Sequence, residues 1–228
     1  MPILLILFAL LVLLVANWFL RRYQRLQRDA FIRHYSFPYG LFERLRKQHP
    51  QLSLKDCQLV ANGLRQFFLA HLHSGQQFVS MPSQVADDLW HEFILYTRNY
   101  QAFCQQAFGR FFHHTPAAIM GSSAASDAGL QRCWREVCQE EHINPRAPTR
   151  LPLLFALDSK LQIVNGYRYV PDCSGVQRST DGSSAVHCGG ALGSCGGGDG
   201  GSDGSSSDSD GGGGDGGGCG GGCGGGGD

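Results

Sequence analysis

The sequence predicts a mainly α-helical protein: an N-terminal transmembrane helix, a small helical bundle with a terminal β-hairpin, and a disordered Gly-rich tail. Three observations carry this prediction. The first 20 residues are nearly all apolar, apolar side chains then recur at the spacing of amphipathic helices, and most of the 32 glycines lie in residues 189–228. We expect a transmembrane anchor at 1–20, a basic juxtamembrane helix at 21–36, a helical globular domain at 37–175, and a disordered Gly/Ser/Asp/Cys-rich tail at 176–228.

The amino-terminal segment, ILLILFALLVLLVANWFL at residues 3–20, is apolar except for Asn17. A run of about 18 apolar residues is near the lower limit for a helix that crosses a membrane. A cleavable signal peptide is the alternative, but the segment lacks a basic start, and the residues around Asn17 make a poor cleavage site. Trp18 suits the membrane–water interface. We therefore predict an uncleaved, single-pass anchor with the lipid bilayer as its partner.

The charges beside this segment predict its orientation. A basic cluster follows it directly and consists of Arg21, Arg22, Arg25, Arg28 and Arg33. Positively charged residues beside a span remain in the cytoplasm, so we expect the body of the protein on the cytoplasmic face of the cell (inner) membrane. The 9 cysteines form an odd, irregularly spaced set, which is not typical of a secreted disulfide framework and fits a reducing compartment.

Helices account for most of the expected domain. The anchor should continue as a helix to just before Pro38, and a short helix is expected at 39–48. The next helix, at 54–73, begins at Ser53, a good N-cap residue, and carries a continuous apolar stripe. His71 falls inside that stripe, which indicates a buried core histidine with a hydrogen-bond partner; a ligand or relay role is the alternative.

One helix is predicted from Ser83 to Gly109. Its apolar face holds Val85, Leu89, Phe93, Tyr96, Tyr100, Phe103, Cys104 and Ala107. Asp87, Asp88 and His91 lie on the opposite face, at spacings where side chains meet. Because Ile94 and Leu95 flank that face, we expect the Asp and His side chains to lie in a partly dry environment.

The end of the domain should differ from its start. A third amphipathic helix is expected at about 128–141, followed by the apolar stretch LPLLFALD at 151–158. Residues 161–170, LQIVNGYRYV, alternate around Asn165-Gly166, a pair typical of two-residue hairpin turns. This segment is the basis for the predicted β-hairpin.

A metal site is the sharpest chemical hypothesis. The candidate polar cluster is Asp87, Asp88, His91, His113 and His114. Carboxylates and imidazoles are suitable ligands for zinc, and His91, Asp88 and His114 are the expected ligands. Adjacent histidines usually point in different directions, so at most one of His113 and His114 should join. The zinc motif H-E-x-x-H is absent. A structural Asp–His cluster is the favoured interpretation, and no cofactor is predicted.

The cysteines offer two further hypotheses. Cys104, Cys133 and Cys138 lie on apolar helix faces, so we expect buried, unreactive thiols rather than nucleophiles. The tail thiols Cys188, Cys195, Cys219 and Cys223 could bind zinc or copper(I). Ordering a glycine-rich chain around such an ion would cost much conformational entropy, so a disordered tail is the favoured interpretation.

These patterns favour a non-enzymatic protein: a helical interaction or scaffold domain with a protein partner. Trp90, Tyr100 and Phe111 are the residues that we expect at the contact. No basic face with interleaved aromatic residues is present, so nucleic acid is not an expected partner. The alternative is a metal-dependent enzyme or metal-binding protein that uses Asp88, His91 and one of the two adjacent histidines.

The segment MPSQVADDLWHEFILYTRNYQAFCQQAFGRFFHHTP resembles the glycine-rich domain-containing protein-like family. The matching positions are Pro82, Asp88, Trp90, His91, Thr97, Tyr100, Phe103, Cys104, Phe108, Gly109, His113, His114 and Pro116. The resemblance covers residues 37–175 and implies a small membrane-anchored protein of the kind found among bacterial members. It implies no established reaction. The RNA binding linked with plant members is not expected, because this chain has no recognisable RNA-binding core motif.

Overall fold

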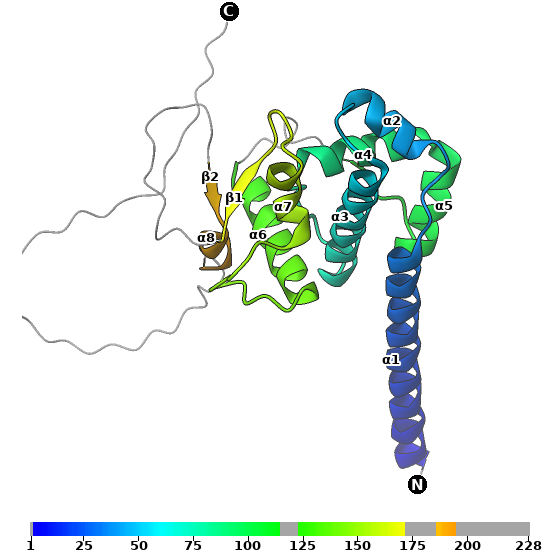
Figure 1. The fold of residues 1–228 in the computed structure, drawn as a ribbon. Helices are drawn as coiled ribbons and strands as arrows, with labels where there is room; N and C mark the ends of the chain where they lie inside the picture. Colours follow the sequence, from blue (N-terminus) through cyan, green and yellow to red (C-terminus); the bar gives the residue numbers. More distant parts are fainter. Residues whose placement is uncertain (1, 115–122, 172–185, 195–228) are drawn as a thin grey trace, which may run out of the picture. The chain divides into compact units, whose positions relative to one another are not determined.

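The computed structural model describes residues 2–114, 123–171 and 186–194 (Figure 1). The helices are α1 (Pro2–His34), α2 (Leu41–Gln48), α3 (Leu54–His73), α4 (Gln84–Leu95), α5 (Thr97–Phe108), α6 (Ser123–Glu140), α7 (Leu153–Lys160) and α8 (Gly189–Ser194). The short strands β1 (Arg168–Val170) and β2 (Val186–Cys188) accompany them. The mainly helical fold class is therefore confirmed.

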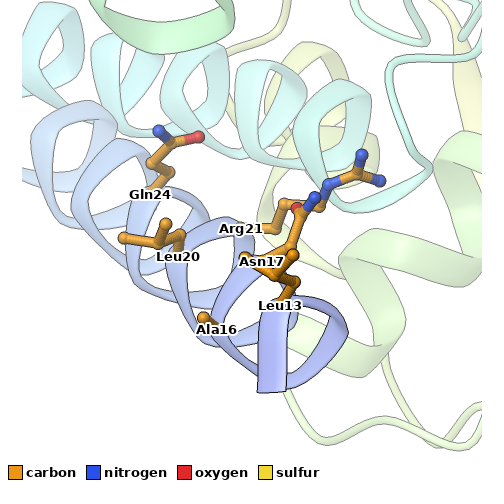
Figure 2. A pocket seen from close by; sticks show the side chains of 6 residues that line it. All are labelled: Leu13, Ala16, Asn17, Leu20, Arg21 and Gln24. Carbon is orange, nitrogen blue, oxygen red and sulfur yellow. The ribbon is translucent and has the colours of Figure 1, made fainter. Parts of the chain in front are cut away.

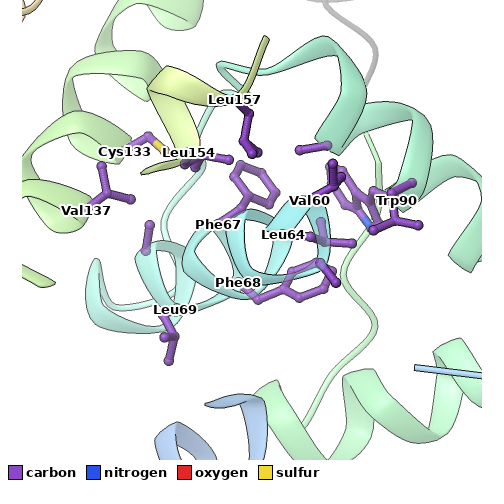
Figure 3. Close-up of a cluster of buried hydrophobic side chains, with 14 of the residues drawn as sticks. Val60, Leu64, Phe67, Phe68, Leu69, Trp90, Cys133, Val137, Leu154 and Leu157 are labelled. Carbon is purple, nitrogen blue, oxygen red and sulfur yellow. The ribbon is translucent and has the colours of Figure 1, made fainter. Parts of the chain in front are cut away.

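Helix α3 is the centre of the core and contacts α1, α2, α4, α6 and α7. Figure 3 shows its apolar side chains facing those of the surrounding helices. The residues labelled there are Val60, Leu64, Phe67, Phe68, Leu69, Trp90, Cys133, Val137, Leu154 and Leu157. Each large apolar side chain buried in this way stabilises the fold by roughly 1.5–3 kcal/mol. The predicted apolar stripe of residues 54–73 thus packs on several helices at once.

The start of α3 agrees with the sequence in detail. The Oγ of Ser53 accepts a hydrogen bond from the backbone N of Asp56, at 3.2 Å. The Asp56 carboxylate accepts one from the backbone N of Ser53, at 2.8 Å. Each residue satisfies a backbone donor that the helix itself leaves free. The predicted boundaries, 54–73, are confirmed.

The single helix predicted from Ser83 to Gly109 is wrong, because the chain bends at Tyr96 and divides it into α4 and α5. The backbone of Tyr96 leaves the helical region, with φ −80° and ψ 59°. The bend lets one residue from each helix pack on Tyr35, just after α1. The ring centroids of Tyr35 and Phe93 are 5.7 Å apart, and those of Tyr35 and Phe103 are 4.7 Å apart. Tertiary packing therefore overrides the local helical periodicity.

The predicted β-hairpin at 161–170 is also wrong. Strand β1 pairs instead with β2, in parallel, with Tyr169 opposite His187. The preceding residues wrap around the end of α7: the N of Ile163 bonds to the carbonyl of Asp158 at 2.9 Å, and the N of Tyr167 to its carboxylate at 2.8 Å. Asn165 adopts a φ of 63° within this turn. These bonds use the donors that a hairpin ladder would need.

The chain beyond β1 folds back onto the domain where the structure describes it. Helix α8 contacts α6, and a Cβ on Gly189 would lie 2.4 Å from Cη2 of Trp134. Residues 186–194 thus pack on the domain, although they follow the expected start of the tail at residue 176. The remainder of the expected disordered tail, at 176–185 and 195–228, lies outside the described residues.

Candidate functional site

A buried carboxylate holds the amino end of α4, the helix that carries the polar cluster. Asp158, 3% exposed, accepts hydrogen bonds from the Oγ of Ser83 at 2.7 Å and from the backbone N of Gln84 at 2.7 Å. The N of Val85 donates to the same carboxylate at 3.2 Å. A negative charge at a helix amino terminus is favourable, because the free N–H groups and the helix dipole both face it. The first turn of α4 is therefore fixed in position.

The next turn of α4 brings three of the candidate residues together. Nε2 of His114 lies 3.0 Å from Oδ1 of Asp87, and Nδ1 of His91 lies 3.6 Å from Oδ2 of the same carboxylate. The ring centroids of His91 and His114 are 4.2 Å apart. Asp87 and His91 come from one face of α4, whereas His114 comes from the segment after α5. We call these three residues the Asp87 cluster.

The neighbouring carboxylate belongs to a different group. Asp88 accepts from Nε2 of His49 at 2.8 Å and from the side-chain amide of Gln84 at 3.0 Å. The expectation that Asp88 would join His91 and His114 therefore fails, and Asp87 takes that place. Sequence reasoning missed His49, because no helical spacing relates a residue just beyond α2 to one on α4. His113 turns away, with its ring 4.8 Å from that of Phe111.

A buried network sets the position of His114. The indole N–H of Trp90 donates to the Tyr100 hydroxyl at 3.1 Å, and that hydroxyl donates to the carbonyl of Phe112. The Trp90 ring also packs edge-on against the His114 ring, with centroids 4.6 Å apart. Because the backbone at 112 and the ring at 114 are both held, His114 lies beside Asp87 in a defined orientation.

The exposure of these residues decides what can reach them. Asp87 and Asp88 are half-buried, whereas the His91 side chain is 49% exposed. The cover expected from Ile94 and Leu95 is incomplete, since Leu95 is exposed. The environment is thus partly dry at the carboxylates and open at His91.

The residues expected at a partner contact also differ in exposure: two are buried and one is exposed. Trp90 and Tyr100 are buried, at 4% and 1% exposure, and serve the network described above. Phe111 is 44% exposed and packs edge-on against the Tyr100 ring, with centroids 5.3 Å apart. Of the three, Phe111 alone presents its ring to solvent.

His71 is a core histidine, as the sequence indicates. Its Nδ1 lies 2.9 Å from the carbonyl O of Gln77, and its ring stacks on Phe112 with centroids 3.9 Å apart. A carbonyl oxygen only accepts, so Nδ1 carries the proton. Burial lowers the pKa of His71 to about 4, because the charged ring would lose its hydration.

The cysteines of the domain are buried thiols, as expected. Burial raises the pKa of Cys104 and Cys133, and raises that of Cys138 to about 12, so the nucleophilic thiolate is disfavoured. Of the four tail thiols, Cys188 lies among the described residues and is disulfide-bonded. Cys195, Cys219 and Cys223 lie outside them.

The Asp87 cluster has the composition of a small metal site. Each residue offers one ligand atom, and the three atoms lie within 4.8 Å of one another. Two imidazole nitrogens and one carboxylate oxygen are ligands that zinc accepts. The cluster could therefore hold a metal, or act as an ion-paired surface group.

Comparison with known proteins assigns the chain to a different family from the one that the 81–116 segment resembles. A family model described as UCP032817-like matches residues 27–192, and the resemblance to the glycine-rich domain-containing protein-like family is therefore wrong. The misleading positions, such as Trp90 and Tyr100, belong to the buried network that fixes the 112–114 segment. No curated protein and no solved structure matches the chain. Since the matched region spans most of the sequence, the chain belongs to the UCP032817-like family.

Proposed function

We propose that this protein is a single-pass membrane protein whose helical domain binds a protein partner close to the bilayer surface. The observation that carries the proposal is the continuity of α1. One uninterrupted helix, Pro2–His34, begins with an exposed apolar half and ends packed in the domain. An apolar helix attached to the domain without a linker would hold the domain at a fixed distance from the membrane.

The apolar half of α1 supports insertion by its composition and exposure. Of the described helices, Ile6–His34 within α1 is long and apolar enough to cross a membrane or to act as a signal sequence. The most apolar part of this helix is not buried in the protein. A shallow pocket runs along this helix and is lined by Leu13, Ala16, Asn17, Leu20, Arg21 and Gln24 (Figure 2). All six belong to α1, and lipid chains would contact the apolar end of this pocket, at Leu13, Ala16 and Leu20, in a bilayer.

The basic half of α1 is part of the domain. Arg25 donates to the backbone carbonyl of His73 at 2.8 Å, and Nε2 of His73 lies 2.6 Å from the Asp29 carboxylate. Arg33 forms ion pairs with Asp29 and Glu140. Ile32, fully buried, lies about 18 Å along the helix from Leu20, at about 1.5 Å per residue. The domain core therefore begins within a few helical turns of the apolar segment.

We propose the cytoplasmic orientation in the inner membrane, supported by the five arginines that follow the apolar run. The disulfide at Cys188 favours the opposite side, because disulfides persist in oxidising compartments. Labelling of intact cells with a membrane-impermeant amine reagent distinguishes the two orientations. Lys47, Lys55 and Lys160 should remain unlabelled until the membrane is opened; labelling in intact cells would refute the cytoplasmic orientation.

Insertion itself is tested by extraction. The full-length protein should stay with membranes after alkaline carbonate treatment and keep its initial residues in an intact-mass measurement. A Leu10→Arg, Leu14→Arg double variant should become extractable, because each arginine at the centre of a span costs roughly 2.5–3.5 kcal/mol. Gln24→Arg, placed in the basic half, is the control. Loss of the segment by cleavage near Trp18 would instead identify a signal peptide.

The proposed partner contact is tested at Phe111, whose exposed ring packs against that of Tyr100. A photocrosslinking residue at 111 in the full chain should capture a discrete partner in membranes, whereas the same residue at exposed Lys55 should not. Equal crosslinking at both positions would refute a specific surface at 111. The alternative function, a metal-dependent enzyme or a zinc-binding protein, does not depend on membrane attachment and is favoured only by the Asp87 cluster.

A further inference from the structure

We propose that the Asp87 cluster (Asp87, His91 and His114) is a binding site for one divalent transition-metal ion of the zinc class, with one coordination position open to solvent. The ligand atoms are a carboxylate oxygen of Asp87, Nδ1 of His91 and Nε2 of His114, the atoms that face one another across the cluster. The site is independent of the membrane anchor.

The spacing of the ligand atoms fits such an ion. Zinc binds nitrogen and oxygen at about 2.0–2.2 Å in tetrahedral geometry, which places neighbouring ligand atoms about 3.4 Å apart. One oxygen of the Asp87 carboxylate lies 3.0 Å from Nε2 of His114, and the other oxygen lies 3.6 Å from Nδ1 of His91. The three ligand atoms lie within 4.8 Å of one another, so rotations of the Asp87 carboxylate and of the two rings would bring them to coordination distance.

The hydrogen bonds leave one side of the cluster unsatisfied. Within the described residues, His91 forms no hydrogen bond, and its 3.6 Å approach to Asp87 is beyond hydrogen-bond range. Asp88, by contrast, is occupied by both His49 and Gln84. A carboxylate oxygen and an imidazole nitrogen that face each other without a bond are a pair that a bound cation would join.

The donor set narrows the class of ion. Imidazole nitrogens favour zinc and its transition-metal neighbours, whereas magnesium and calcium prefer sites made wholly of oxygen. Three protein ligands leave a fourth position for water or another small ligand, as in zinc sites that are not purely structural. The exposed edge of His91 places that position toward solvent.

The surrounding structure holds the ligands in place before any ion binds. Asp158 fixes the first turn of α4, which carries Asp87 and His91. The Tyr100 hydroxyl fixes the backbone at Phe112, two residues before His114. Ligands that their neighbours already orient lose less conformational entropy on binding, which favours a specific site over loose association.

The proposal is tested by titrating zinc into the full-length protein in detergent and measuring the stoichiometry and Kd of binding by calorimetry. The background is a Cys195→Ser, Cys219→Ser, Cys223→Ser variant, so that tail thiols cannot supply the ligands. We expect one zinc per chain and no comparable binding of magnesium. Substitution of His91→Ala or His114→Ala should raise the Kd at least about 100-fold, the upper end of what loss of an outer-shell partner costs. His113→Ala, adjacent but turned away, should leave the Kd unchanged.

Two further variants keep the result interpretable if an alanine variant unfolds. Asp87→Asn retains the shape and a hydrogen-bonding oxygen but removes the anionic ligand, and it should weaken zinc binding while the thermal unfolding curve without metal stays cooperative. An unchanged Kd in Asp87→Asn and His91→Ala would overturn the proposal. So would zinc binding that disappears in the tail-cysteine background, or magnesium binding of equal strength, which would indicate attraction by charge alone.

Discussion

At the scale of single residues, His71 links the core to pH. Its pKa is lowered to about 4 by burial, from 6.5 in the unfolded chain. Between these two values the unfolded state binds a proton that the folded state does not, so stability falls as the pH drops from 6.5 toward 4. The full effect is roughly 2–3 kcal/mol, at about 1.4 kcal/mol per pKa unit with allowance for residual solvent. His71→Gln should flatten this part of the pH dependence of thermal unfolding; an unchanged slope would contradict the assignment.

Asp158 is the residue with the largest expected effect on stability. Its carboxylate accepts from Ser83, from two backbone N–H groups at the start of α4 and from Tyr167. Asp158→Asn turns an NH₂ group toward some of these donors and should destabilise the fold by roughly 2–4 kcal/mol, because hydrogen bonds to a buried charge are among the strongest. Thermal unfolding would measure this loss. Asp127→Asn, on the exposed face of α6, is the control and should have little effect.

The residues also show what local sequence can and cannot specify. Ser53 and His71 could be interpreted correctly, because a cap or an apolar stripe is a local pattern. The choice between Asp87 and Asp88 could not. Both lie within one turn of His91, and only the distant partners His114 and His49 separate their roles. Residues joined only by the tertiary fold leave no mark in the spacing of a single helix.

At the scale of elements, the close packing of α3 on α7 depends on Gly63. A Cβ at this position would lie 2.4 Å from Cδ1 of Leu157, whose side chain is fully buried. Gly63→Ala gains about 1 kcal/mol of helix propensity but forces the helices apart, so we expect a net destabilisation of roughly 1–2 kcal/mol. Denaturant unfolding would measure it. Gln58→Ala, on the exposed face of α3, should be neutral or slightly stabilising; an equal response at both positions would refute tight packing at Gly63.

The two incorrect elements have a common cause. The bend at Tyr96 and the turn at 161–166 both occur where a contact with a distant segment outweighs a strong local pattern. The Tyr35 ring packs against both Phe93 and Phe103, and the Asp158 carboxylate accepts a hydrogen bond from the backbone N–H of Tyr167. A regular spacing of apolar residues predicts that a helix or strand is favoured. It does not show where tertiary contacts interrupt that helix or strand.

At the scale of the whole molecule, the question is how firmly α1 is joined to the domain. The sequence predicts the helix itself, since its apolar and basic halves are contiguous. It does not predict the ion pair between Arg33 and Glu140, which are 107 residues apart. The hydrogen bond from Arg33 lowers the pKa of Glu140, so the stabilisation from this pair is present above pH 4.5 and is lost as the pH falls through the lowered value.

A variant of this pair tests whether α1 and the domain behave as one unit. Glu140→Gln removes the charge and should destabilise the fold by only about 1 kcal/mol, because both side chains are partly exposed. Hydrogen exchange should nevertheless rise specifically in residues 21–34, because the Arg33–Glu140 pair links this half of α1 to α6. Arg44→Ala, which breaks the ion pair with Glu92 between α2 and α4, is the matched control and should leave exchange in α1 unchanged. Equal exchange in α1 for the wild type and Glu140→Gln would mean that Ile32 and the Asp29–His73 pair suffice to hold α1 on the domain, without the link to α6.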